Sequence, residues 1–133
     1  MKHASSPLVR RLCAMSGLAL CLCALPGCNT TGTGTGGSAV AYKRGELEAN
    51  LPKDYDAVFM AARRAIKELE FTPISENKDA LKAVLVARTG LDKKVEITLI
   101  NSGKRLTNIK IRVGVFGDEQ LSPLILDRIK AGW

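Results

Sequence analysis

The stretch KVEITLINSGKRLTNIKIRV, residues 94–113, alternates apolar and polar side chains on both sides of a short polar loop. In its first half Val95, Ile97 and Leu99 share one face of an extended chain, with polar residues between them. Asn, Ser and Gly in residues 101–104 favour a tight turn. The return strand, from Arg105, is expected to place on one face Thr107, Ile109, Ile111, Val113 and Val115. Two alternating runs joined by such a loop predict an antiparallel β-hairpin with one buried face.

Upstream of this hairpin the sequence predicts one strand and one helix. Residues 39–50 are expected to form a single strand, in which Gly45 marks a bulge or a bend. Pro52 and Asp54 then open the most clearly amphipathic helix of the chain. Its apolar residues recur at spacings of three and four, as one face of a helix requires. They are Tyr55, Phe59, Ala62, Ile66 and Leu69.

Two further strands and a second helix complete the predicted elements. Residues 71–76 form a short strand that Pro73 places at a sheet edge or at a bulge, and residues 81–88 pair back on it. Near the C-terminus Ser122 is expected to cap a helix that has Pro123 at its first position. Leu121 and Leu126 are placed for a hydrophobic staple at the start of this helix. Its apolar face is expected to contain Leu121, Ile125, Ile129 and Trp133.

The order strand, helix, four strands, helix predicts an α+β fold. Hairpin-connected strands with one apolar face form an antiparallel sheet, and both amphipathic helices are needed to cover that face. We therefore expect a two-layer domain, an antiparallel sheet covered on one face by two helices, over residues 39–133.

The N-terminus has the features of an export signal. Residues 1–11 are basic, and residues 12–25 are almost entirely apolar but shorter than the roughly 20 residues that cross a bilayer. The run ends in Leu25-Pro26-Gly27-Cys28, which resembles the lipobox of bacterial lipoproteins. The resemblance implies a signal peptide over 1–27 and a lipidated Cys28, with a Gly/Thr-rich tether up to Ser38. An uncleaved helical anchor and a plain secretory signal are the alternatives.

Composition narrows the functional classes. All four cysteines lie in residues 1–28, so the predicted domain has no disulfide, and Cys21 and Cys23 would leave with the signal. Removal of the signal takes away three basic residues and no acid, which lowers the formal net charge from +7 to +4. These charges are spread along the chain without interleaved aromatics, so nucleic acid is not an expected partner.

The run Ile109-Lys-Ile-Arg-Val-Gly-Val-Phe-Gly-Asp118, followed by Ser122, carries a second resemblance. Together with the lipobox it is similar to a family of small proteobacterial lipoproteins of unknown function. That family implies a cell-envelope location and no catalytic residue. Asn29, where such proteins carry Asp for inner-membrane retention, implies transfer to the periplasmic leaflet of the outer membrane, with the inner membrane as the alternative. The order of elements also resembles helix-grip domains of other envelope lipoproteins, an analogy of fold only.

The predicted mature chain contains no histidine and no thiol apart from the lipidated one, because His3 lies in the signal. We therefore expect no enzyme, no cofactor and no metal site. The carboxylate pairs Asp54/Asp56, Glu68/Glu70 and Asp118/Glu119 sit at helix ends, where solvation or capping explains them. One patch stands out, in which Arg112 projects from the polar sheet face and Asp118 lies in the following turn. It is either an anion-binding site, or a tight turn in which Asp118 caps a helix or pairs with Arg112.

Two functions remain open for this domain. The first is a membrane-tethered structural or interaction module that presents a sheet edge or the polar sheet face to another envelope protein. The second is a binding module for a lipid or glycan held between helix and sheet. The sequence does not indicate the oligomeric state.

Overall fold

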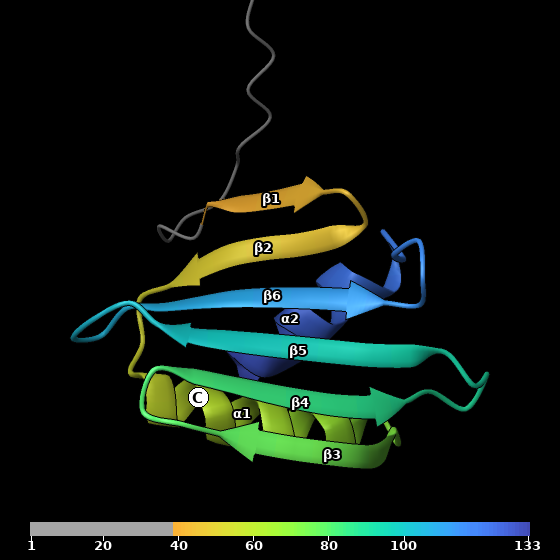
Figure 1. Ribbon diagram of the computed structural model, residues 1–133, viewed down its shortest axis with the longest axis horizontal. Helices are drawn as coiled ribbons and strands as arrows, with labels where there is room; N and C mark the ends of the chain where they lie inside the picture. The colour runs from red at the N-terminus through yellow and green to blue at the C-terminus, as the bar shows by residue number, and fades with distance from the viewer. Residues whose placement is uncertain (1–38) are drawn as a thin grey trace, which may run out of the picture. The chain divides into compact units, whose positions relative to one another are not determined.

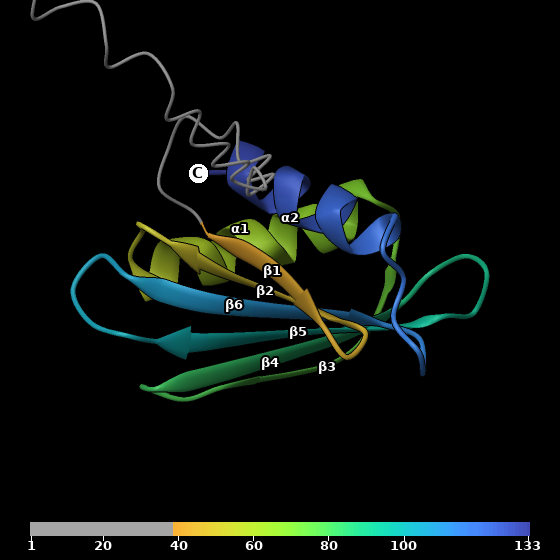
Figure 2. The same ribbon diagram turned by 90° about the horizontal axis from the view of Figure 1, so that it is seen from above.

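A computed structural model of the protein describes residues 39–133, which form a six-stranded antiparallel sheet and two helices. The strands are β1 (Val40–Lys43), β2 (Glu46–Leu51), β3 (Thr72–Lys78), β4 (Lys82–Arg88), β5 (Lys94–Asn101) and β6 (Thr107–Val113). The helices are α1 (Tyr55–Glu68) and α2 (Leu121–Ala131). The strand order across the sheet is β1-β2-β6-β5-β4-β3, and both helices lie on the same face (Figure 1, Figure 2). The predicted α+β fold with a two-layer architecture is confirmed.

The core lies between the helices and the inner face of the sheet. The buried face predicted for residues 94–113 is confirmed. Its side chains Ile97, Leu99, Ile109 and Ile111 are completely buried. They pack in one cluster with apolar residues of both helices, among them Val58 and Ile129. The stripe predicted for α1 is also buried except for Leu69, which ends the helix and is partly exposed.

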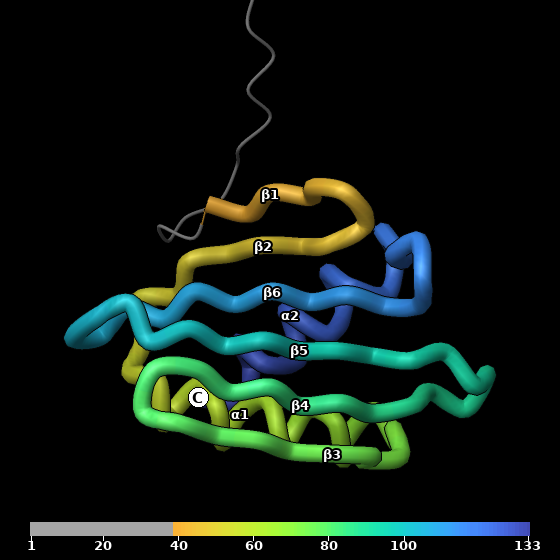
Figure 3. The backbone as a smooth tube through the Cα atoms, viewed as in Figure 1, coloured from red at the N-terminus to blue at the C-terminus, as the bar shows by residue number. Residues whose placement is uncertain are grey.

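The segment predicted as one strand, residues 39–50, is instead a hairpin. β1 and β2 pair antiparallel, with Tyr42 opposite Leu47, and the chain reverses at Arg44 and Gly45 (Figure 3). Both turn residues have left-handed backbone angles, φ 53° at Arg44 and 79° at Gly45. Gly45 was expected to bend the strand, and the bend is a complete reversal because two consecutive residues adopt positive φ.

Pro73 lies where the sequence places it. β3 pairs only with β4 and is an edge strand of the sheet. Its register with β4 shifts between Pro73 and Ser75. Both of the predicted alternatives, an edge position and a bulge, therefore hold at this residue.

The start of α2 differs from the prediction. The helix begins at Leu121, and its first amides are capped by Asp118, whose carboxylate accepts hydrogen bonds from the backbone N–H groups of Gln120 and Leu121. Ser122 lies inside the helix, and its buried hydroxyl has no hydrogen-bond partner among the described residues. The expected staple at a Ser122 cap is therefore wrong, although Leu126 is in the core.

Val115 was predicted on the buried face and is exposed. β6 ends at Val113, and Gly114 has a left-handed backbone with φ 70°, which turns the chain out of the sheet before Val115. The following loop returns to the β1–β2 turn. A Cβ atom on Gly45 would lie 2.8 Å from the carbonyl carbon of Phe116, and one on Gly117 would collide with the backbone of Gly45. Two glycines that lie far apart in the sequence thus permit a close contact between the backbones of two turns.

This contact predicts different effects of alanine at two glycines with similar backbone angles. Gly114→Ala meets no neighbouring atom within 4 Å and should lose only the left-handed penalty, about 1–2 kcal/mol of unfolding free energy. Gly117→Ala adds a collision with Gly45 and should cost roughly 3 kcal/mol or more. Urea unfolding followed by circular dichroism measures both. Equal losses would show that the contact between the turns does not constrain the fold.

Candidate functional site

Of the residues singled out in the sequence, Cys28 lies outside the described residues, and Arg112 and Asp118 lie near one end of the sheet. Arg112 is the last outer-face residue of β6, between Glu46 on β2 and Glu96 on β5. Its guanidinium donates a hydrogen bond to the carbonyl oxygen of Val115 at 3.1 Å. Within residues 39–133 it forms no ion pair with a carboxylate, so Arg112 fastens the loop that follows β6.

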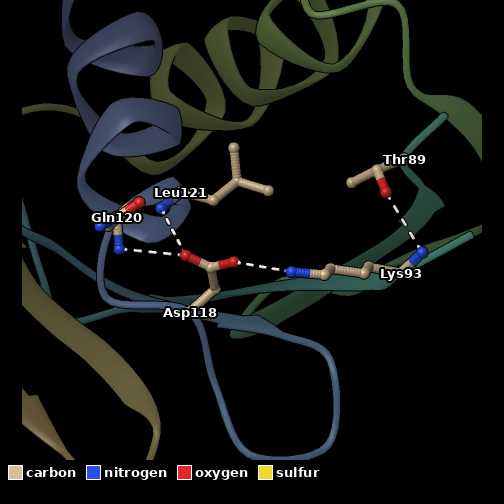
Figure 4. A network of polar contacts seen from close by, with 5 residues as sticks. All are labelled: Thr89, Lys93, Asp118, Gln120 and Leu121. Carbon is tan, nitrogen blue, oxygen red and sulfur yellow. Dashed lines mark hydrogen bonds and ion pairs between the residues drawn. The ribbon is translucent and has the colours of Figure 1, made fainter. Parts of the chain in front are cut away.

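Asp118 pairs with a different cation from the one expected. Its Oδ1 caps α2 by accepting from the amides of Leu121 at 2.9 Å and Gln120 at 3.0 Å, and its Oδ2 lies 3.0 Å from Lys93 Nζ (Figure 4). The hydrogen bond from Leu121, then that from Lys93 and that from Gln120, lower the pKa of Asp118 below its ordinary value. The role of helix cap is thus observed, while the partner is Lys93 rather than Arg112.

Arg112 and Asp118 nevertheless line the same surface depression, of about 750 Å³, which also contains Val115 and Phe116. Tyr42 contributes to the floor beneath this region, because its hydroxyl is buried close to Gly117. Burial, reinforced by Glu119 and Asp118, raises the pKa of Tyr42. The hydroxyl therefore stays protonated at physiological pH.

The polar face of the sheet is largely self-paired. Lys110 lies 3.7 Å from Glu46 and 3.9 Å from Glu48, and Asn108 donates to Glu48 and to Asn50. Such partly exposed pairs contribute little stability individually but satisfy one another across the strands. This arrangement describes a solvated outer face.

One member of each carboxylate pair noted in the sequence lies beside a cation. Asp56 pairs with Lys78, and Glu68 lies 3.6 Å from Arg128. Among residues 39–133, no group of three His, Cys, Asp or Glu side chains is placed to hold a metal ion. The expectations that the protein is not an enzyme and carries no cofactor stay predictions.

A second feature of this end of the domain is a group of exposed apolar side chains. Phe116 is 91 % exposed, Leu91 83 % and Val115 78 %, and Leu124 on α2 is also exposed. A depression of about 500 Å³ beside Leu91 and Leu124 is lined in addition by Phe71 and Leu121, and it shares the Lys93–Asp118 pair with the first depression. We call these residues, from Thr89 to Lys93 and from Gly114 to Leu124, the distal loop surface.

Most charges of the distal loop surface are paired, whereas Glu119 on it and Arg112 at its border form no ion pair within residues 39–133. Lys93 binds Asp118, and on the flanking strands Arg88 pairs with Asp92 at 2.8 Å and Lys94 with Glu96 at 2.9 Å. The surface is thus close to neutral as well as apolar. The sequence analysis singled out the run 109–118, which contains Phe116, but did not identify this surface. The available signal was a large apolar residue within each of two Gly-containing turns.

The space between the helices and the sheet is filled by side chains. Val58, Ile97 and Ile109 are completely buried there, and Ile125 is nearly so. The two depressions described above are lined mainly by loops and by the start of α2, and a small one of about 110 Å³ lies at the sheet edge between α1 and strands β3 and β4. Within the described residues, a ligand held between helix and sheet, one of the two hypotheses from the sequence, would therefore have only this small depression, which is below the roughly 300 Å³ typical of small-molecule sites.

A family model described as "Protein of unknown function (DUF3568)" matches residues 11–132. A search of the curated proteins found no match. Within residues 39–133, neither helix is long and apolar enough to cross a membrane.

The bonds to Asp118 predict a pH-dependent contribution to stability. A carboxyl whose pKa is lowered by folding stabilises the native state fully above its unfolded pKa, about 3.9, and this contribution is lost as the pH falls through the folded pKa. Asp118→Asn should therefore lower the thermal midpoint by a few degrees at pH 7, and the difference from wild type should narrow below pH of about 4.

Calorimetry between pH 7 and pH 2 measures this difference. Asp127→Asn, which changes a carboxylate on the exposed side of the same helix, is the matched control and should leave the midpoint nearly unchanged. If the difference in thermal midpoint between wild type and Asp118→Asn stayed constant down to pH 2, the assignment of the lowered pKa to Asp118 would be contradicted.

Proposed function

Because the chain belongs to this family of proteins of unknown function, we propose a role from its own residues: a lipid-anchored envelope lipoprotein that acts as a non-catalytic protein-interaction module. Cys28 carries the anchor in this proposal. The distal loop surface binds a partner protein of the envelope.

The lipid anchor is supported by the arrangement of the N-terminal residues. A basic segment, a short apolar run and the sequence Leu25-Pro-Gly-Cys28 follow one another in the order of a lipoprotein signal. Acyl chains contribute about 0.8 kcal/mol per buried methylene, so two or three chains on one cysteine make attachment effectively permanent. Asn29 after the cysteine supports placement in the outer membrane, facing the periplasm, with the inner membrane as the alternative.

The interaction role rests on one observation, the exposure of Phe116, Val115 and Leu91 at the same end of a small domain. Large apolar side chains grouped on a surface mark binding sites more often than chance exposure does. Aromatic residues are over-represented among the side chains that dominate interface energies. Because most charges around them are already paired, a complementary partner would be a mainly apolar protein surface.

A second candidate is the binding of a small envelope ligand. The depression beside Phe71, Leu91, Leu121 and Leu124 has about 500 Å³, within the range of small-molecule sites. Its mainly apolar lining favours an acyl group over a glycan. Lipid that co-purifies with the protein and is displaced by Leu124→Glu would favour this candidate over the protein partner.

The anchor predicts that Cys28→Ser abolishes lipidation. Wild type should incorporate labelled palmitate and fractionate with membranes, whereas the variant should lose the label and accumulate as unprocessed precursor. Cys23→Ser is the matched control and should behave as wild type, because that residue precedes the cleavage site. Unchanged processing and fractionation of Cys28→Ser would disprove the anchor.

The distal loop surface predicts that Phe116→Ser weakens association with the partner without unfolding the domain. Truncation of an aromatic at an interface centre typically costs 2 kcal/mol or more, about 30-fold in affinity. Because Phe116 is 91 % exposed, the thermal midpoint should change little. Crosslinking in cells followed by mass spectrometry of adducts measures the loss.

Met60→Ser on α1 removes another exposed apolar side chain, 55 % exposed, and serves as the control. Equal adduct yields for Phe116→Ser, Met60→Ser and wild type would exclude this surface as the interface.

A further inference from the structure

Several loops that connect helices and strands lie together at the end of the domain where residue 39 is located. Leu81, in the β3–β4 turn, accepts a hydrogen bond from the Asn101 amide at 2.8 Å, and Thr107 Oγ1 donates to the Lys53 carbonyl at 2.9 Å. These contacts place the β2–α1, β3–β4 and β5–β6 connections side by side (Figure 1). β1 starts near the same level, since Val40 pairs with Ala49 and Ala49 with Ile109. We call this end, residues 39–40, 52–54, 79–82, 102–106 and 132–133, the entry end.

The entry end differs electrostatically from the distal loop surface. Four of its cations form no ion pair with a carboxylate within residues 39–133, namely Lys53, Lys82, Lys104 and Arg105. The carboxylates of this end are Asp54 and Asp79, together with the neighbouring Asp56, which is bound by Lys78. Positive charges therefore exceed negative ones here. At the other end Lys43 and Arg44 of the β1–β2 turn also form no ion pair within residues 39–133, so these two cations are a matched comparison for those of the entry end.

Apolar side chains are exposed among these cations. Leu81 is 72 % exposed, and Val40, Leu106 and Trp133 are also accessible to solvent. The Lys53 ammonium lies 6.0 Å from the centre of the Trp133 ring, so a cation and an aromatic side chain are neighbours at this end. Tryptophan, leucine and lysine in this combination suit the boundary between lipid headgroups and acyl chains.

The length of the preceding chain limits how far the entry end can lie from a lipid attached to Cys28. Ten residues, 29–38, separate Cys28 from Ala39, and even fully extended they span no more than roughly 36–40 Å. With Cys28 lipidated, the entry end would stay within that distance of the bilayer. Such tethering gives an effective concentration high enough for weak contacts to be occupied.

We propose that the entry end is a docking surface for an anionic phospholipid bilayer, the one to which Cys28 attaches the protein. This inference rests on the proposed lipid anchor. Lys53, Lys82, Lys104 and Arg105 would contact lipid phosphates, while Leu81 and Trp133 would enter the headgroup region. Docking in this orientation directs the distal loop surface away from the membrane and toward a partner.

The chain supplies its own probe, because Trp133 is its single tryptophan. The lipoprotein is reconstituted in nanodiscs of zwitterionic phosphatidylcholine, with or without about one third phosphatidylglycerol, using lipids brominated near the headgroup. Trp133 fluorescence should be quenched in anionic discs, and the quenching should fall in zwitterionic discs or at high salt, where charge attraction is screened.

Two double variants with matched chemistry locate the contact. Lys104→Gln with Arg105→Asn removes two cations of the entry end, and Lys43→Gln with Arg44→Asn removes two at the β1–β2 turn. Both arginines have left-handed backbones, φ 58° and 53°, which asparagine tolerates. Only the first variant should reduce quenching. The ratio of docked to undocked protein in anionic discs should fall about 25-fold, at roughly fivefold per cation.

Several results would overturn the proposal. They are absence of quenching in anionic discs, an equal effect of the two variants, or shielding of Trp133 only when a co-purified acidic protein is present. Failure of the anchor is recognised separately, because wild type would then incorporate no labelled palmitate. In that case, quenching of the protein by anionic vesicles that depends on Lys104 and Arg105 would still support docking of the entry end.

Discussion

The pairing of β2 with β6 is the constraint on which the rest of the domain depends. Leu47 lies opposite Ile111 and Ala49 opposite Ile109, so residues more than fifty positions apart in the chain share one buried ladder. Closing so long a loop costs chain entropy, which the burial of these side chains beneath α1 and α2 must offset. β6 also pairs with β5, and it therefore joins the N-terminal hairpin to the four-stranded part of the sheet. Loss of this pairing would leave β1 and β2 without a core.

The same pairing determines the shape of the loop after β6. Because β2 is fixed against β6, the β1–β2 turn lies beside Gly117, and only a residue without Cβ fits at either side of this contact. Arg112 and Asp118 then hold the two ends of the loop, one by a hydrogen bond to Val115 and the other by capping α2 and binding Lys93. The loop is thus held at several points, yet it leaves Val115 and Phe116 in solvent. Packing gives no reason for that exposure, which is why a binding role is the more economical interpretation.

Periodicity was enough to predict the layers, and contacts between distant segments account for what it missed. The alternation in β5 and β6 and the apolar stripe of α1 reflect local geometry, so they could be read directly. The reversal at Arg44 and Gly45 could not, because alternation continues on both sides of it and only one of the two turn residues is glycine. Ser122 followed by Pro123 resembles a helix start, but Asp118 takes the capping role because the loop held at Gly117 brings its carboxylate to the amides of Gln120 and Leu121. The partner of Asp118 is on the β4–β5 loop, 25 residues away in sequence, and no local pattern indicates it.

The two ends of the domain differ in the side chains that they expose. This difference would favour one orientation of the domain relative to a membrane. Around the distal loops Lys93 pairs with Asp118, Arg88 with Asp92 and Lys94 with Glu96, and the most exposed apolar groups of the domain lie beside these pairs. At the entry end Lys104 and Arg105 form no ion pair within the described residues, so long-range attraction to negative charge dominates there. A short connection to a lipidated residue would bring the cationic end toward the bilayer first. Strands of the sheet run between the two ends, so docking of the entry end on a membrane would place Phe116 on the side away from it.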